Sequence, residues 1–316
     1  MDAFLIMLKN VLVFVLLAVP GLILVKTKQL KSEQSGVLSK VMLYIAVPFL
    51  VLDSVMDVSF DSELLRVMGI SALISIVFLT ALFFLSRPLT AMEKNAKTRG
   101  IMRFATTFTN NGFLGFPLVA AVFPDKPLVM TSVVVINLIM NVYMYTLGVF
   151  LITGDKSNMS VKKAVLNPVL IAFAVGLLFN LLNVPAHVPE VSTYAGYLGG
   201  IVTALSMLIL GMKLGDVSLK SMFASWKTYY VAAIKLVVMP VIVVGIVLAL
   251  HYAFALGEAI VLGTFVSFAL PSATLGITFA DNYGGDTTSG VTFTLGNTVL
   301  SVATISLLYA LLQAVL

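Results

Sequence analysis

The chain alternates between long apolar runs and short polar stretches. A membrane-spanning helix needs about 20 predominantly apolar residues. The runs that meet this requirement lie at approximately 4–25, 35–55, 64–86, 101–122, 128–152, 164–184, 195–214, 225–250, 257–281 and 288–314. A membrane β-barrel would instead show short strands of alternating polarity, which unbroken runs such as 231–250 lack. The pattern predicts an all-α polytopic membrane protein with ten transmembrane helices and short loops.

Two of these runs are interrupted by polar residues, glycine and proline. Residues 109–117 read Thr-Asn-Asn-Gly-Phe-Leu-Gly-Phe-Pro, and residues 269–276 read Ala-Leu-Pro-Ser-Ala-Thr-Leu-Gly. Proline lacks an N–H and clashes with the carbonyl four residues back, so Pro117 and Pro271 are expected to break helices 4 and 9. Such breaks must be buried in protein or line a wet cavity. They are either ordinary proline kinks or the broken helices of a transporter's midplane site, and their matching places favour the site.

Loop charges predict how the helices are oriented. Basic residues follow the first, third, fifth and seventh runs, whereas the alternate loops are acidic or neutral, with Lys126 and the acidic loop 281–290 as exceptions. The basic set includes Lys26, Lys28, Lys31, Arg87, Lys94, Lys97, Arg99, Arg103, Lys156, Lys162, Lys163, Lys220 and Lys227, and the acidic set includes Asp53, Asp57, Asp61, Glu63, Glu190 and Glu258. The positive-inside rule places the basic loops in the cytoplasm and both termini outside it.

Five helices in each half is an odd number, so the second half must enter the membrane upside down relative to the first. The sequence therefore predicts two inverted repeats, residues 1–155 and 156–316, within one membrane domain. An offset of about 160 residues supports this division. It places Gly112 on Ser272 and Asn137 on Asn297.

The candidate substrate-binding residues gather at the two breaks and on helices 5, 8 and 10. They are Asn110, Asn111, Gly112, Pro117, Asn137, Asn141, Lys235, Pro271, Ser272, Ala273, Thr274 and Asn297. Half-helices that restart after a break expose N–H groups and positive dipole ends, which suit a carboxylate. Amides and hydroxyls add neutral hydrogen bonds. The alternative for the polar residues of helices 5 and 10 is interhelical hydrogen bonding.

Charged residues at membrane depth indicate which kind of solute the site can bind. Lys235 lies about ten residues into its run, too deep to reach the interface easily, and is either a counter-ion for an anionic substrate or a structural partner. All 14 Asp and Glu residues fall in loops or near span ends. A proton relay or cation pump usually carries a carboxylate at depth, so the pattern favours an anion site. Sodium coupling through carbonyl and hydroxyl oxygens stays open.

Composition excludes several other classes of protein. Of the 316 residues, 60% are hydrophobic and only 10% charged, too few to cover a water-soluble domain. The net charge of +5 lies in topology-setting loops, so nucleic-acid binding is not expected. There is no Cys, and His187 and His251 are unpaired, so neither a metal site nor a cofactor is predicted.

The sequence offers no enzyme site. It has no His-Glu-x-x-His and no Gly-x-Ser-x-Gly motif, nor any acid at depth. A channel would need symmetric rings or a carbonyl filter, which an inverted repeat does not favour. A membrane sensor without flux stays an alternative.

The chain resembles the auxin efflux carrier family of secondary transporters. The motifs that carry the resemblance are Asn-Asn-Gly-Phe-Leu-Gly-Phe-Pro at 110–117, Leu-Pro-Ser-Ala-Thr at 270–274, Leu-Gly-Met-Lys-Leu-Gly at 210–215 and Tyr-Ile-Ala-Val-Pro at 44–48. The resemblance covers essentially the whole chain. It implies ten helices in two inverted repeats, crossing helices 4 and 9, a scaffold domain and a transport domain, and a homodimer.

The resemblance also implies a substrate class. Bacterial members resemble carriers of small organic anions such as malate, malonate or lactate, whereas plant members export auxin. Only about a dozen residues join helices 5 and 6, so the chain lacks the long central loop of many plant relatives. We therefore expect a bacterial-type permease of the inner (plasma) membrane that moves a mono- or dicarboxylate by alternating access. Coupling to H⁺ or to Na⁺ and uniport without a coupling ion all stay open. An exporter of an auxin-like aromatic acid is the alternative.

Overall fold

The computed structural model describes residues 2–56 and 58–316, and its ordered elements within these ranges are helical. Asp57, one of the acidic loop residues, lies outside the described residues. Within these described ranges, eight helices are long and apolar enough to cross a membrane: Phe4–Lys26, Ser32–Met56, Ser62–Leu89, Pro127–Thr153, Lys156–Leu181, Glu190–Gly215, Trp226–Phe254 and Thr287–Gln313. These agree with eight of the predicted runs, and the all-α membrane class is confirmed.

Several of the eight are built from consecutive segments. The elements are α1 (Asp2–Lys26), η1 (Ser32–Gln34), α2 (Ser35–Val41), η2 (Met42–Ala46), α3 (Val47–Met56), α4 (Ser62–Leu89), α7 (Pro127–Tyr143), η4 (Met144–Gly148), α8 (Val149–Thr153), η5 (Lys156–Asn158), α9 (Val161–Val165), α10 (Pro168–Leu181), α12 (Glu190–Gly200), α13 (Val202–Gly215), α15 (Trp226–Ala233), η6 (Ile234–Val238), α16 (Met239–Phe254) and α19 (Thr287–Gln313). Short helices α11 (Val184–His187) and α14 (Leu219–Met222) join longer ones.

The other two predicted runs, 101–122 and 257–281, are each split in two. The first contains most of α5 (Ala96–Thr107), followed by η3 (Asn111–Gly115) and α6 (Phe116–Val122). The second contains α17 (Glu258–Ala269) and α18 (Leu275–Asn282). Each pair of pieces is separated by a few residues of non-helical backbone.

A wide, π-helical turn precedes three of the prolines inside apolar helices. It occupies residues 42–46 before Pro48, 111–115 before Pro117 and 234–238 before Pro240. Proline cannot donate a backbone hydrogen bond and clashes with the preceding turn, so widening that turn relieves the clash. Pro117 therefore lies inside a continuing helix, and the first break falls at residues 108–110 rather than at this proline. The expectation that Pro117 itself breaks helix 4 is wrong.

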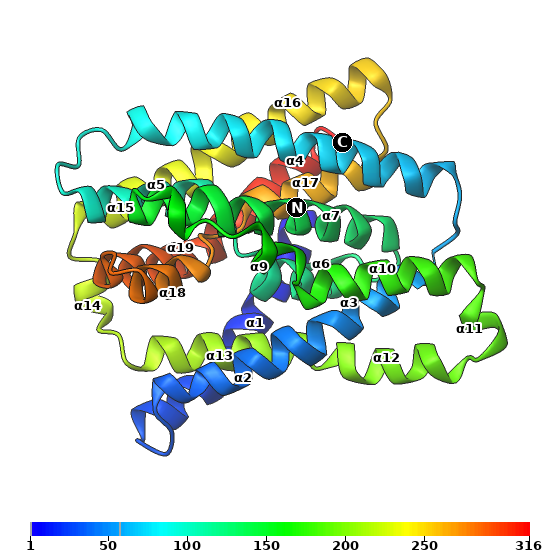
Figure 1. The fold of residues 1–316 in the computed structure, drawn as a ribbon, viewed down its shortest axis with the longest axis horizontal. Helices are drawn as coiled ribbons and strands as arrows, with labels where there is room; N and C mark the ends of the chain where they lie inside the picture. Colours follow the sequence, from blue (N-terminus) through cyan, green and yellow to red (C-terminus); the bar gives the residue numbers. More distant parts are fainter. Residues whose placement is uncertain (1, 57) are drawn as a thin grey trace.

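The helices pack in two groups (Figure 1). In one group α1 lies along α13, and α3 contacts α10 and α12; in the other α7 contacts α4 and α17, while α19 contacts α15 and α18. The groups meet where α1 contacts α19 and where α3 contacts α7. Glycines bring α1 and α13 together: a Cβ on Gly211 would lie 1.8 Å from the Ala18 carbonyl oxygen. The backbones can approach this closely only without a side chain there.

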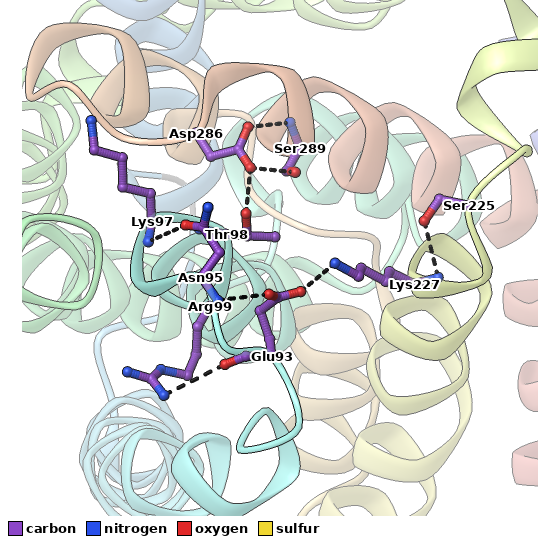
Figure 2. Close-up of polar contacts among 9 residues, drawn as sticks. All are labelled: Glu93, Asn95, Lys97, Thr98, Arg99, Ser225, Lys227, Asp286 and Ser289. Atoms are coloured by element: carbon purple, nitrogen blue, oxygen red, sulfur yellow. Dashed lines mark hydrogen bonds and ion pairs between the residues drawn. The ribbon is translucent and has the colours of Figure 1, made fainter.

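A polar cluster, here called the loop cluster, joins the ends of α5, α15 and α19 (Figure 2). Glu93, in the loop before α5, forms an ion pair with Lys227 at the start of α15. On α5, the hydroxyl of Thr98 donates to a carboxylate oxygen of Asp286, 2.6 Å away. Asp286 also caps α19 by accepting the backbone N–H of Ser289 at 3.0 Å. The cluster fixes α5, α15 and α19 relative to one another at one end of the molecule.

Both acids of this cluster are held in their charged form. The hydrogen bond with Lys227 lowers the pKa of Glu93 below its ordinary value, helped by the backbone N–H of Asn95. Partial burial raises the pKa of Asp286, but hydrogen bonds from Ser289 and Thr98 outweigh it and keep the pKa low.

Candidate transport site

The two interrupted segments pair with each other through their backbones. The N–H of Asn110 donates to the carbonyl oxygen of Pro271 at 2.9 Å, and the N–H of Ala273 donates to that of Phe108 at 3.0 Å. These bonds form an antiparallel bridge centred on Thr109 and Ser272. Backbone groups released by each break thus find partners in the other, as non-helical backbone buried within a membrane protein requires. We call residues 108–111 and 270–274 the crossing.

Side chains from neighbouring helices hold the crossing from behind. The hydroxyl of Ser272 donates to the carbonyl oxygen of Ala105 at 2.7 Å and accepts the side-chain amide of Asn297, on α19, at 2.6 Å. The ammonium of Lys235, on η6, donates to the hydroxyl of Thr109 at 2.6 Å. Lys235 and Ser272 are fully buried. The crossing is therefore tied to both α19 and η6.

A cavity of about 140 Å³ lies against the other side of the crossing. Its lining comes from both groups of helices: Leu43, Tyr44 and Val47 from η2 and α3; Thr109, Asn110, Gly112, Phe113 and Phe116 from the first interrupted segment; Asn137, Asn141, Met144 and Tyr145 from α7 and η4; Lys163, Leu166, Asn167, Pro168 and Val169 from α9 and α10; and Ala273, Thr274 and Leu275 from the second. The cavity thus lies where the two groups meet.

The cavity lining combines hydrogen-bonding groups with apolar surface. Amide side chains come from Asn110, Asn137, Asn141 and Asn167, and the lining residues that the structure describes include one cation, Lys163, and no carboxylate. The helices restarting at η3 and α18 both begin at the cavity, where Gly112 and Thr274 lie. The first N–H groups of a helix have no partner within it, so both helix starts favour a negative group.

Six of the predicted binding residues line this cavity and six do not. The lining set is Asn110, Gly112, Asn137, Asn141, Ala273 and Thr274, and the remaining set is Asn111, Pro117, Lys235, Pro271, Ser272 and Asn297. Of the second set, Asn111, Pro271 and Ser272 belong to the crossing itself. Lys235 and Asn297 lie behind it, and Pro117 lies on α6, the helix that continues from it. Asn111 is fully buried, and the structure describes no hydrogen-bond partner for either polar atom of its side chain.

Five polar cavity residues were not among the candidates: Tyr44, Thr109, Tyr145, Lys163 and Asn167. In the sequence, Lys163 served only to orient the helices, as one of the basic loop residues. Asn167 is the N-cap of α10, where its side chain accepts the N–H of Val169 at 2.9 Å. Neither signal points to a cavity, because both residues reach it only through packing between distant helices. Within residues 2–56 and 58–316, no cluster of His, Asp or Glu is arranged to hold a metal ion.

Comparison with known proteins identifies the family. A family model described as a membrane transport protein matches residues 6–309. A curated protein of Methanothermobacter thermautotrophicus, described as an uncharacterized transporter, is 29% identical over 275 residues, covering 86% of each chain. Both point to a transporter rather than an enzyme, and the eight apolar helices agree with a membrane protein. The chain therefore belongs to this membrane transport protein family, the auxin efflux carrier family, as its sequence motifs predicted.

Proposed function

We propose that this protein is a secondary transporter that carries a small organic anion, a mono- or dicarboxylate, through the cavity at the crossing. One observation carries the proposal. Two interrupted segments, bonded to each other through their backbones, each restart a helix at a cavity rich in amides and hydroxyls whose lining residues contain no Asp or Glu. Helix starts and neutral donors at membrane depth suit a carboxylate better than a cation.

The architecture supports alternating access. Taken as membrane spans, the eight long helices and the two interrupted segments would pass through the bilayer ten times, five times in each of residues 1–155 and 156–316. An odd number in each half implies inverted repeats. The group containing α1, α3, α10, α12 and α13 serves as the scaffold, and the other group carries the crossing. Rocking or sliding of one group against the other would open the cavity to each side in turn.

The orientation follows from loop charge. The cavity includes Lys163, from one of the basic loops that the positive-inside rule assigns to the cytoplasm. In this orientation the cavity faces the cytoplasmic side of the inner (plasma) membrane, and both termini lie on the other side. We also propose a homodimer, which the resemblance to the family implies, and coupling to H⁺ or Na⁺.

Aromatic side chains in the cavity favour one alternative substrate. Tyr44, Phe113, Phe116 and Tyr145 line it, and a ring on the solute could pack against them. An aromatic monocarboxylate of the auxin type is therefore the second candidate. Competition between an aromatic acid and lactate, malonate or malate for the same uptake would rank the two classes.

The test is counterflow in proteoliposomes containing the purified protein. Labelled lactate, malonate, malate and an aromatic acid are each offered to vesicles loaded with the unlabelled compound. We expect saturable counterflow for at least one carboxylate and a loss of about tenfold or more in Asn111→Ala and Thr274→Ala, because each removes a neutral donor from the crossing. Unchanged transport by both variants would reject the site, and binding without counterflow would indicate a sensor.

The coupling ion is tested in the same vesicles. A proton gradient and a sodium gradient are imposed separately, and uptake of the transported carboxylate is compared with uptake when neither is present. An ion that drives accumulation is the coupling ion. Equal uptake under all conditions would make the protein a uniporter.

A further inference from the structure

Lys163 is the basic residue at the rim of the cavity, and its position is fixed by the backbone. It lies on the short helix α9, which begins directly after Ser160. The backbone N–H of Ser160 donates to the carbonyl oxygen of Tyr145 at 3.0 Å. Tyr145 itself lines the cavity. This bond attaches the start of α9 to η4, so the Lys163 side chain extends from a fixed point beside the cavity.

The ammonium of Lys163 has only a weak partner in the structure. Its Nζ lies 3.4 Å from the hydroxyl oxygen of Tyr283 and 6.0 Å from the centroid of that ring. Both contacts are at the long end of their ranges. Among the residues that the structure describes, no Asp or Glu forms an ion pair with Lys163. A carboxylate would be a stronger partner than a neutral phenol, because both groups of the new pair would be charged.

Tyr283 connects this position to the crossing. It follows directly after α18, whose first residue, Leu275, lines the cavity at the other end of the helix. A row of rings links Tyr283 back to the cavity: its ring centroid lies 6.2 Å from that of Phe279, which lies 5.2 Å from that of Tyr145. The aromatic row thus forms a wall that runs from the cavity to the resting place of the ammonium.

We propose that Lys163 is the residue that recognises the charge of the solute. In the empty protein its ammonium rests on Tyr283, and when a carboxylate enters the cavity the ammonium leaves the phenol and pairs with it. The crossing then contacts the rest of the solute with neutral donors. This assignment rests on the proposed transport of an organic anion and adds a specificity-determining residue to that site.

The neighbouring residue offers a matched control. Lys162 and Lys163 lie side by side on α9 and carry the same charge, but Lys162 is not part of the cavity lining. Removing either charge changes the loop potential equally, so a general effect on anion concentration at the surface would appear in both variants. Only a direct contact with the solute would distinguish them.

The experiment measures counterflow kinetics in proteoliposomes with labelled lactate, malonate and malate. We expect Lys163→Met and Lys163→Gln to raise KM by about 10- to 100-fold with a smaller change in kcat, the loss expected for a charged hydrogen bond. Lys163→Arg should stay within about threefold of wild type, since it keeps the charge. Lys162→Met should leave KM unchanged. Tyr283→Phe should lower KM, because the ammonium loses the hydroxyl that it contacts at rest.

Two outcomes would overturn the assignment: an unchanged KM in both Lys163→Met and Lys163→Gln, or an equal rise in Lys162→Met. Melting temperatures of the purified variants establish that each is folded. Thr274→Ala separates this inference from the proposed function. If that variant raises KM and the Lys163 variants do not, only the role of Lys163 is rejected. If neither affects KM, the site itself is rejected.

Discussion

The same three helical regions are joined at two levels, and the two junctions differ in how completely their polar groups are paired. At the loop cluster, Glu93 pairs with Lys227, and Asp286 accepts hydrogen bonds from Thr98 and Ser289. At the crossing, α5, η6 and α19 meet again. Here Lys235 bonds the neutral hydroxyl of Thr109, and the side chains of Asn111 and Asn297 contain buried atoms for which the structure describes no partner.

Under the proposed function, this difference separates a structural junction from a binding one. Buried polar atoms without partners destabilise a protein by about 1–3 kcal/mol each, so their presence calls for an explanation. The loop cluster needs no further group. The crossing keeps unpaired buried polar atoms directly beside cavity-lining residues, since Asn111 lies between Asn110 and Gly112.

The largest effect is expected at Ser272. Ser272→Ala removes its bonds to Ala105 and Asn297 and leaves two buried polar atoms unpaired, a cost of about 1–3 kcal/mol each. Both the melting temperature of the purified protein and its transport rate should fall. Ser306→Ala is the control, because the hydrogen bond that the structure describes for this buried serine stays within its own helix, to the carbonyl oxygen of Val302. Equal losses in the two variants would show that Ser272 does not hold the crossing.

Lys235 should affect anion binding more than stability. Lys235→Met keeps an unbranched side chain but removes the ammonium behind Thr109, and exchanging a buried charge for an apolar group often costs little. We expect the affinity for the transported carboxylate to fall by about 10- to 100-fold, since Thr109 lines the cavity and loses its charged donor. Equilibrium binding and melting curves measure both quantities. Normal affinity would remove Lys235 from the binding role.

Two asparagines of the crossing should differ in stability. Asn297 donates to Ser272, so Asn297→Leu should destabilise the protein by about 1 kcal/mol or more. Asn111→Leu removes an amide for which the structure describes no partner, so the melting temperature should stay equal or rise. The melting temperatures of the two variants are compared without solute. If Asn111→Leu proves the less stable of the two, the amide of Asn111 is already satisfied in the folded protein.

The smallest effect belongs to the loop cluster. Lys227 keeps about one-third of its side chain exposed (35%), although Glu93 is nearly buried (8%), so Glu93→Gln should cost about 1 kcal/mol and leave anion affinity unchanged. The pKa of Glu93 is lower in the folded protein than its ordinary value of 4.5, so its contribution is complete above that pH and is lost as pH falls through the folded pKa. The difference in melting temperature between wild type and Glu93→Gln should therefore be present at pH 7 and shrink in acid. A difference independent of pH would exclude the ion pair as its cause.

The sequence predicted the helices better than it predicted the cavity. Apolar runs locate eight long helices because length and hydropathy are local properties. The position of the first break was wrong because a π-helical turn absorbs Pro117, and turn width depends on packing. Which polar residues face the cavity could not be predicted, since the polar residues of helices 8 and 10 mark no single polar face and the rotation of each helix is set by its neighbours. Lys235 and Asn297 therefore lie behind the crossing, while Lys163 reaches the cavity from the short helix α9.

The most direct test of the account is equilibrium binding of a labelled carboxylate to the purified protein, with lactate, malonate and malate as the probes. We expect saturable binding of at least one of them, weakened by about tenfold or more in Asn141→Leu and Thr274→Ala and unchanged in Ser306→Ala. A carboxylate that binds wild type and all three variants with the same affinity would contradict the claim that the crossing and its cavity hold the solute.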